Sequence, residues 1–458
     1  MIHQYKCNGY SIVLDVNSGA VHVVDELAYD AIALFEKEEH EEILARLRDR
    51  YPEKEIQEVL EDIQELKNQG TLFSEDIYQD KILSRQMNSK SPNSTVVKAL
   101  CLHIAHDCNL ACRYCFAEEG EYHGRRALMS YETGRQALDF LIANSGNRKN
   151  LEVDFFGGEP LMNWQVVKDL VAYGRKQEKL YDKKFRFTLT TNGVLLNDEV
   201  EEFVNREMSN VVLSLDGRQE INDKMRPFRG GKGSYDLIVP KFQKLADSRN
   251  QEKYYVRGTF TRNNLDFCED VLHLADLGFK QISVEPVVAA PEEPYALREE
   301  DIPAICEEYD KLAAEMIKRH HTEKNFNFFH FMIDLTGGPC VYKRLSGCGS
   351  GTEYLAVTPW GDLYPCHQFV GEESFLMGNV FDGVKNTDLQ KKFASCNVYS
   401  KEKCQNCFAK FYCSGGCAAN SYKFHGSIHD AYDIGCELQR KRIECAIMIK
   451  AALAGQGE

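Results

Sequence analysis

Apolar residues in the first part of the chain are spaced first as in strands and then as in helices. Three short strand-like runs come first, and residues 16–19 supply a turn between the second and the third. From Asp25, a potential N-cap, to Gly70, a helix stop, Ile, Leu and Val recur every three or four residues. The pattern predicts a small separate winged-helix-like domain over residues 1–75.

A different pattern follows a break in the chain. Residues 76–95 gather Ser, Asn and Pro without periodicity, as a linker does. From residue 96 to residue 330, strand-like runs alternate with segments long enough for crossover helices. This alternation predicts an α/β fold of parallel βαβ units, either an open doubly wound sheet or a partial barrel. The strand-like runs are residues 99–105, 151–156, 185–191, 211–216, 254–260 and 281–287.

The distinctive short segments of this region each follow a predicted strand. CNLACRYC follows the first strand, GGEP the second, NG the third and DG the fourth. In parallel α/β folds, the loops at the carboxyl ends of the strands form the active face. We therefore expect these four segments to meet at one end of the sheet.

Charge and hydropathy exclude several classes of protein. The chain has 55 basic and 70 acidic residues and a formal net charge of −15, which argues against a nucleic-acid binder with a broad basic face. No apolar run approaches the about 20 residues that span a bilayer, and the N-terminus has no apolar export signal. We therefore expect a cytoplasmic protein with neither nucleic acid nor membrane as a partner.

The chain contains 17 cysteines, many of them clustered. Because cytoplasmic thiols stay reduced, metal ligation explains the clusters better than disulfides do. Residues 331–458 combine many cysteines with little regular structure, which predicts a domain folded around metal. The isolated cysteines are expected to be small buried residues, and they are Cys7, Cys101, Cys268, Cys306, Cys396 and Cys445.

The segment CNLACRYC places three thiols at C-x3-C-x2-C spacing. They are Cys108, Cys112 and Cys115. Three soft sulfur ligands suit zinc or an iron–sulfur cluster and leave one coordination position open. A structural zinc would need a fourth ligand, for which His103, His106 or Asp107 are candidates. The aromatic side chains of Tyr114 and Phe116 are expected to shield a site that must be dry.

With Tyr114 before its last cysteine, this segment resembles the C-x3-C-x-aromatic-C motif of the radical S-adenosylmethionine (SAM) superfamily. The resemblance implies that the three cysteines hold a [4Fe–4S] cluster and that SAM chelates the fourth iron. GGEP resembles the motif that contacts the SAM amino group, which implies that Gly157, Gly158 and Glu159 bind the cofactor. Glycine lets the backbone approach a ligand, and a carboxylate favours a cationic amine.

Further SAM contacts are implied at the ends of the third and fourth strands. Polar side chains there are expected to bind the ribose or the carboxylate of SAM, and an arginine could pair with that carboxylate. A strand-end Ser or Arg is also often only a cap or a solvated charge. The candidates are Thr191, Asn192, Ser214, Asp216, Arg226 and Arg257.

The cysteines beyond residue 331 resemble the seven-cysteine pattern of the SPASM extension, which implies two auxiliary [4Fe–4S] clusters and three clusters in all. The implied ligands of the distal cluster are Cys404, Cys407, Cys413 and Cys436, and those of the proximal cluster are Cys348, Cys366 and Cys417. Cys340 is the candidate eighth ligand. If Cys340 does not bind, the proximal cluster has an open iron that could take a substrate thiolate.

The order of the three domains resembles the thioether-forming maturases of six-cysteine (SCIFF) peptides. That resemblance implies a Cys-rich precursor peptide, bound through its leader at residues 1–75, and a bond from a cysteine sulfur to the α-carbon of a Thr. An exposed strand edge in that domain could add the leader as a further strand. The resemblance also implies an electron donor such as flavodoxin or ferredoxin, and an anaerobic host.

Two other functions remain open from the sequence. Anaerobic sulfatase maturases oxidise a Cys or Ser to formylglycine, but His367 stands where those enzymes carry an acidic base. A zinc-organised peptide-binding scaffold without catalysis is the alternative from another class. The N-terminal domain could in that case be a helical oligomerisation module.

Overall fold

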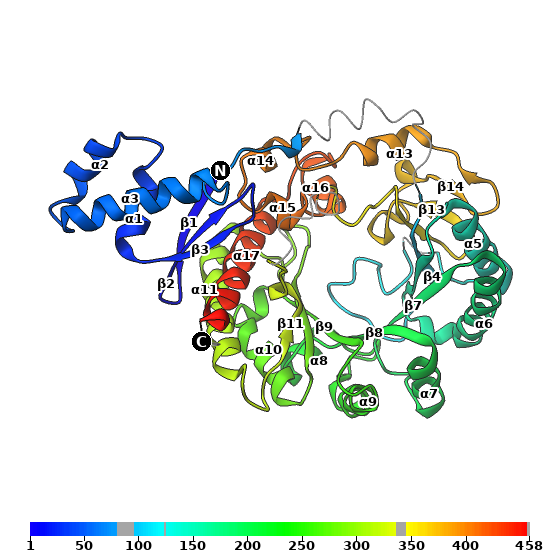
Figure 1. Cartoon of the computed structure of the whole chain (residues 1–458). Coiled ribbons are helices and arrows are strands. Elements are labelled where there is room, and N and C mark those ends of the chain that lie inside the picture. Colours follow the sequence, from blue (N-terminus) through cyan, green and yellow to red (C-terminus); the bar gives the residue numbers. More distant parts are fainter. Residues whose placement is uncertain (80–95, 123–124, 336–344, 456–458) are drawn as a thin grey trace.

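A computed structural model describes residues 1–79, 96–122, 125–335 and 345–455. Figure 1 shows a curved α/β body with helices on its outer side and a smaller N-terminal unit beside it. The predicted α/β fold with a partial barrel is confirmed: its strands are parallel and lie in sequence order. They are β4 (Ala99–His106), β6 (Asn150–Gly157), β7 (Lys184–Thr191), β8 (Met208–Ser214), β9 (Tyr254–Phe260) and β10 (Gln281–Pro286), followed by the short β11 (Asn327–Phe328).

The helices between these strands bury their apolar stripes against the sheet and leave their polar faces to solvent. The strands also have two different faces. In β7, Phe185, Phe187 and Leu189 are buried and alternate with less buried residues. The helices are α5 (Tyr131–Asn144), α6 (Trp164–Tyr181), α7 (Asp198–Glu207), α8 (Gln219–Met225), α9 (Tyr235–Ser248), α10 (Phe267–Asp276) and α11 (Ile302–Arg319).

Strand β4 is buried along its whole length because it lies inside the sheet. One of its neighbours is β6, and the other is β12 (Tyr354–Val357), which comes from the Cys-rich region and runs parallel to it. The sheet therefore continues across residue 331, where we placed a domain boundary in the sequence. It ends in short antiparallel strands, which are β13 (Asp362–Tyr364), β14 (Gly378–Asn379) and β15 (Gly383–Val384), while β5 (Ala127–Leu128) pairs with β4.

The N-terminal unit is a three-stranded antiparallel sheet followed by helices. Asp25 caps the first helix by accepting a hydrogen bond from the Ala28 backbone N–H at 2.8 Å. Within the described residues, β3 pairs only with β2, so its other edge has no strand partner. The elements are β1 (Ile2–Cys7), β2 (Tyr10–Asp15), β3 (Val21–Val24), α1 (Glu26–Leu34), α2 (His40–Leu47) and α3 (Glu53–Asn68).

This unit contacts the C-terminal part of the chain directly. The hydroxyl of Tyr5 in β1 donates to the Glu444 carbonyl at 2.9 Å, and the His3 ring stacks on Phe408 with 3.5 Å between centroids. Glu444 belongs to α17 (Asp433–Ala454), which lies between β1 and α11 (Figure 1). The remaining helices of the Cys-rich region are short, and they are α13 (Thr387–Ala394), α14 (Glu402–Gln405), α15 (Lys410–Cys413) and α16 (Ala418–His425).

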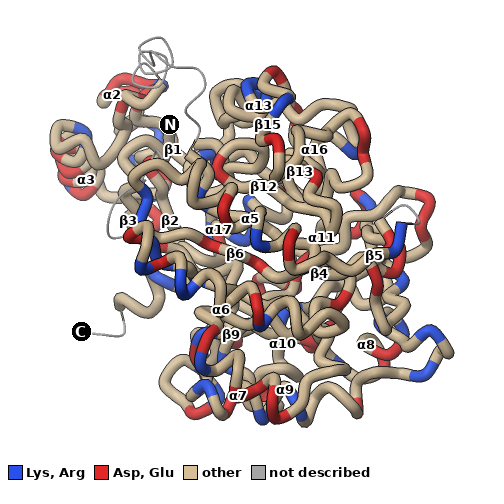
Figure 2. The backbone as a smooth tube through the Cα atoms, turned by 90° about the vertical axis from the view of Figure 1, so that its right-hand side faces the viewer, with Lys and Arg blue, Asp and Glu red and all other residues tan. Residues whose placement is uncertain are grey.

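Charged side chains of both signs are distributed along the chain. Figure 2 shows Lys and Arg interspersed with Asp and Glu, and acidic residues concentrated on α2 and α3 of the N-terminal unit. Among the helices that the structure describes, none has the length and apolar character needed to cross a bilayer.

Candidate active site

The cysteine loop after β4 lies against the GGEP turn after β6. Gly157 has a φ of +121°, and a β-carbon there would lie 2.3 Å from the Ala105 carbonyl oxygen. A β-carbon on Gly158 would lie 2.1 Å from the Asp107 carbonyl oxygen. The Gly158 backbone N–H donates to Ala105 at 2.7 Å. These glycines thus allow one strand end to approach the other, which sequence reasoning had explained only through the cofactor.

A cavity of about 590 Å³ opens at the carboxyl ends of the parallel strands. This volume lies within the range of small-molecule sites. The expected active face is therefore hollow and contains the cysteine loop. Its wall includes Cys108, Cys112 and Cys115 and, of the predicted SAM contacts, Tyr114, Phe116, Gly157, Gly158, Thr191, Asn192, Ser214, Arg226 and Arg257.

The carboxylates of Glu159 and Asp216 are absent from the cavity wall. Glu159 is fully buried and accepts hydrogen bonds from the Asn192 backbone N–H at 2.8 Å and from the Thr191 hydroxyl at 2.9 Å. Burial raises the pKa of Glu159. Its hydrogen bonds join the GGEP turn to the end of β7, so this side chain positions cavity residues.

Asp216 plays a similar part at the end of β8. It is fully buried and accepts hydrogen bonds from the Tyr114 hydroxyl at 2.8 Å and from the Thr259 backbone N–H at 3.0 Å. Burial raises the pKa of Asp216 to about 6. The contact with Tyr114 fixes the cysteine loop relative to the fourth strand.

Arg226 carries an unpaired N–H group beside this network. Its Nη1 donates to the Tyr114 hydroxyl at 2.9 Å, whereas its Nε is buried and has no hydrogen-bond partner. A buried guanidinium with an unsatisfied donor is costly unless an acceptor completes it. The residues therefore fit a ligand with a carboxylate, such as the methionine part of SAM.

We expect Arg226→Met to lower the affinity for SAM about tenfold or more, because a hydrogen bond to a charged group contributes about 1.5–3 kcal/mol. Arg257→Met is the matched control, because Arg257 also lines the cavity but its side chain is 52% exposed and lies 3.6 Å from Glu285. Anaerobic equilibrium dialysis with labelled SAM measures both variants. Equal losses in the two would contradict the assignment.

The three Sγ atoms of the cysteine loop do not all lie within 4.8 Å of one another, as three ligands of a single ion would. Zinc bound by thiolates at about 2.3 Å in tetrahedral geometry requires sulfurs about 3.8 Å apart. In the described part of the chain, the only group of three potential ligands within 4.8 Å of one another lies elsewhere. Burial raises the pKa of Cys108 to about 12 and that of Cys112 to about 11, so bound metal is needed to keep them as thiolates.

The candidate fourth ligands of a zinc site contact other side chains, although His103 Nε2 and His106 Nδ1 are buried without a hydrogen-bond partner. Nδ1 of His103 lies 3.0 Å from Nε2 of His106, and both rings are buried. Asp107 accepts a hydrogen bond from Arg229 at 2.9 Å. These contacts are compatible with a fourth position that is left to a cofactor.

The seven cysteines of the C-terminal region fall into two groups. Cys348, Cys366 and Cys417 line the same cavity as the cysteine loop. The others surround a separate pocket of about 270 Å³, and they are Cys404, Cys407, Cys413 and Cys436. The resemblance to SPASM proteins divides them in the same way. Cys340, the candidate eighth ligand, lies outside the described residues.

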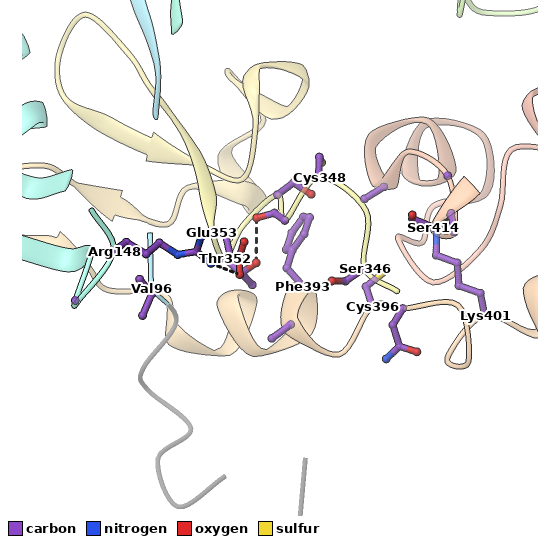
Figure 3. Close-up of a pocket in the computed structure, with 18 of the residues that line it drawn as sticks. Val96, Arg148, Ser346, Cys348, Thr352, Glu353, Phe393, Cys396, Lys401 and Ser414 are labelled. Carbon is purple, nitrogen blue, oxygen red and sulfur yellow. Dashed lines mark hydrogen bonds and ion pairs between the residues drawn. The ribbon is translucent and has the colours of Figure 1, made fainter. Parts of the chain in front are cut away.

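Cys348 also borders a second cavity, of about 890 Å³, on the other side of the Cys-rich region. Figure 3 shows its wall, with the Arg148–Glu353 ion pair at 3.2 Å on one side and Ser414 and Lys401 on the other. Cys396, expected to be an isolated buried thiol, is half-buried here. Of the three-cysteine group, Cys348 thus borders both cavities.

Sequence reasoning missed Glu285, which lines the main cavity at the end of β10. Burial opposes its ionisation, but His330, Arg442 and Arg257 outweigh burial and lower its pKa. A charged residue inside the apolar run QISVEPV was the signal that could have revealed it. The cavity wall therefore includes an ionised carboxylate, which lies 3.6 Å from Arg257.

Comparison with known proteins identifies the domain around this cavity. Residues 102–275 match the model of the radical SAM superfamily. The chain contains a radical SAM domain. The domain includes the cysteine loop, the GGEP turn and the strands from β6 to β9. It implies SAM and a [4Fe–4S] cluster as cofactors, and the cavity residues described above fit both.

Two sequence relatives extend beyond the radical SAM domain. The radical SAM cyclopropyl synthase TigE of Paramaledivibacter caminithermalis is 24% identical over 75% of this chain and 72% of its own length. The antilisterial bacteriocin subtilosin biosynthesis protein AlbA of Bacillus subtilis is 27% identical over 70% of this chain and 68% of its own length.

Two solved structures show the same fold. anSMEcpe, with bound SAM and the Cp18Cys peptide, has a TM-score of 0.64, 18% identity, and covers 79% of this chain and 99% of its own. SuiB of Streptococcus suis, bound to the precursor peptide SuiA, has a TM-score of 0.53, 17% identity, and covers 92% of this chain and 95% of its own. The SuiB alignment therefore takes in more of this chain.

Proposed function

We propose that this radical SAM enzyme joins a cysteine sulfur to the α-carbon of an acceptor residue, a Thr, in a ribosomally made Cys-rich precursor peptide. The observation that carries the proposal is the shared cavity. Cys108, Cys112 and Cys115 occupy one part of its wall, and Cys348, Cys366 and Cys417 occupy another. A peptide in this cavity lies between a radical-generating centre and a second thiolate-held metal centre.

The reaction replaces one C–H bond and one S–H bond by a C–S bond. When bound, SAM and the cluster of the cysteine loop would supply the 5′-deoxyadenosyl radical for hydrogen abstraction, and a cluster held by Cys348, Cys366 and Cys417 would be the acceptor for the surplus electron. The thiol proton goes to solvent. The peptide therefore loses two hydrogens, and one equivalent of 5′-deoxyadenosine forms for each crosslink.

The residues of this chain exclude water from the reacting atoms and orient the peptide. The His367 ring lies 5.5 Å from Phe116 and 5.1 Å from Phe156, measured between centroids, so three rings form one side of the cavity. Burial lowers the pKa of His367 to about 4, so the ring is neutral at pH 7. On the opposite strands, Glu285 and Arg257 offer an acceptor and donors to a peptide backbone.

Relatives support a peptide as the substrate. SuiB binds a precursor peptide and anSMEcpe binds a peptide, and AlbA takes part in the biosynthesis of a bacteriocin. TigE is a cyclopropyl synthase, so its name does not itself point to a thioether. The choice of a thioether for this chain rests on the three-cysteine group in the cavity.

The N-terminal unit supports recognition of a leader peptide. Strand β3 has an edge without a strand partner among the described residues, and a peptide strand can add there through backbone hydrogen bonds. Val23 in this strand is 54% exposed. The N-terminal unit, which contains β3, also contacts α17 and the loop that contains Cys407. A leader bound at β3 would therefore lie on a unit that packs against the Cys-rich region.

We expect Val23→Asp to weaken binding of the precursor about tenfold, because it removes apolar contact worth about 1.4 kcal/mol from the leader site. The matched control is Gln57→Asp, which adds the same charge at an exposed position of α3. Fluorescence anisotropy of labelled precursor measures the affinity. The leader would bind elsewhere if Val23→Asp left the affinity for the precursor unchanged while Gln57→Asp abolished binding.

Mass spectrometry tests the proposed reaction. Anaerobic enzyme, SAM and a reductant such as reduced flavodoxin are incubated with a Cys-rich precursor peptide encoded beside this protein. We expect a product lighter by two hydrogens, with one thiol fewer to alkylate and the crosslink at an α-carbon. A peptide that gains no crosslink while SAM is consumed in its presence would refute the thioether.

The same experiment separates the two alternatives. Formylglycine formation replaces the thiol by an aldehyde, which an aldoxime-forming probe labels. That reaction needs a base for the substrate thiol or hydroxyl, and a neutral His367 with a lowered pKa is a weak one. A protein that contains zinc but no iron and leaves SAM intact under reduction would instead be the non-catalytic scaffold.

A further inference from the structure

Away from the cavity, two cysteines and one aspartate from different parts of the chain converge. Cys7 comes from β1, Asp310 from α11 and Cys445 from α17. The Cys7 and Cys445 Sγ atoms lie 3.1 Å and 3.5 Å from Oδ1 of Asp310. One ligand atom from each residue lies within 4.8 Å of the other two, and the described residues contain no second group of this kind.

We propose that Cys7, Cys445 and Asp310 hold a zinc ion that fastens the N-terminal unit to the rest of the protein. Zinc takes thiolate and carboxylate ligands in tetrahedral geometry, with two sulfurs about 3.8 Å apart and a sulfur about 3.6 Å from an oxygen. The spacing of these three ligand atoms suits one ion, unlike that of the cluster cysteines. The three residues leave the fourth position to water, which the half-buried Asp310 admits, so this site is open where structural zinc sites are usually closed by a fourth side chain.

The charges around the site match the proposed ion. Zinc with two thiolates and one carboxylate carries a net charge of −1. The Lys441 ammonium lies 2.6 Å from Oδ1 of Asp310 and compensates that charge as a hydrogen-bonding neighbour of the ligand. The Asn8 amide donates to the Asp310 backbone carbonyl at 3.0 Å and fixes β1 against α11.

Burial distinguishes these two thiols from ordinary surface cysteines. Cys7 is 4% exposed and Cys445 is fully buried, so their metal complex is shielded from competing ligands. Binding converts two thiols into thiolates, so two protons leave for each ion bound at neutral pH. Cys7 and Cys445 are separated by almost the whole length of the chain, so a metal bound to both restrains the N-terminal unit against α17, in addition to the His3–Glu444 contact at 2.9 Å.

Cys7→Ser and Cys445→Ser test the site, with Cys268→Ser as the matched control. Cys268 is 2% exposed and is a buried thiol outside the group. Zinc and iron are measured by mass spectrometry in protein purified without oxygen and with all clusters reconstituted. We expect one zinc per chain in wild type and control, and at least a tenfold lower zinc content in both variants. Iron content and peptide-independent SAM cleavage should stay within twofold, so this result does not depend on the proposed thioether chemistry.

A second measurement keeps the proposal falsifiable if Cys445→Ser fails to fold. Wild type stripped of zinc with a chelator is titrated with Co²⁺, and a thiolate-to-cobalt absorption band should appear that is absent in Cys7→Ser. Wild type without zinc that also takes up no added zinc or cobalt would overturn the proposal. Zinc content unchanged in Cys7→Ser, or a Cys7–Cys445 disulfide in the reduced and anaerobic protein, would overturn it as well.

Discussion

Replacing Cys108, Cys112 and Cys115 together by Ala should abolish reductive SAM cleavage, with a loss of about 10⁶-fold or more. The reason is that the cofactor carries the reaction and the protein only holds and orients it. All three thiols lie on one cavity wall with Arg226, whose unpaired Nε fits the carboxylate of SAM. 5′-Deoxyadenosine measured by liquid chromatography after reduction gives the rate.

The iron content shows whether this loss is specific. We expect the triple variant to lose about four iron atoms per chain and to keep the iron held by the cysteines beyond residue 331. Its thermal unfolding should resemble that of a triple Ala variant of Cys101, Cys268 and Cys306, thiols that lie outside the predicted cluster groups. Persistent deoxyadenosine formation would remove the loop from the cofactor site.

Replacing Cys348, Cys366 and Cys417 by Ala should separate SAM cleavage from crosslinking. These cysteines share the cavity with the loop but belong to the other region of the chain. We expect the crosslinked peptide to decrease at least about 100-fold, while SAM cleavage in the presence of peptide remains within about threefold of wild type. Simultaneous assays of deoxyadenosine and peptide mass give the ratio of the two products.

The distal cysteines supply the comparison for this variant. Cys404→Ala changes one member of the separate group that surrounds the smaller pocket. We expect it to slow turnover less than the proximal triple variant, because its group does not line the cavity. Crosslinked peptide formed by the proximal variant at the wild-type rate would show that these three cysteines have no role in sulfur transfer.

Local sequence patterns were sufficient to predict the parallel strands and the cysteine loop. The runs from Ala99 to Pro286 are short and apolar, and each became a strand within three residues of its predicted limits, with the largest shift at the start of β8. Asp25 caps α1 as predicted because an N-cap depends only on neighbouring residues. C-x3-C-x2-C likewise carries its chemistry within eight residues.

The pairing of distant groups could not be obtained in this way. GGEP suggested a carboxylate for the SAM amine, but the Glu159 side chain turns inward to Thr191 and Asn192 because burial there requires hydrogen bonds. The unpaired Nε of Arg226 and the position of Glu285 in the cavity depend on how separate strands meet. No motif contains these relations.

By itself the sequence determined the α/β class and the approximate limits of the strands, and it predicted the clustered cysteines as metal ligands, because these follow from spacing along the chain. Only the tertiary structure decided that Cys348, Cys366 and Cys417 share a cavity with the cysteine loop, that β12 lies beside β4, and that Cys7 meets Cys445. These contacts join residues far apart in sequence, and they form only when the closing of the sheet and the packing of α17 bring their elements together.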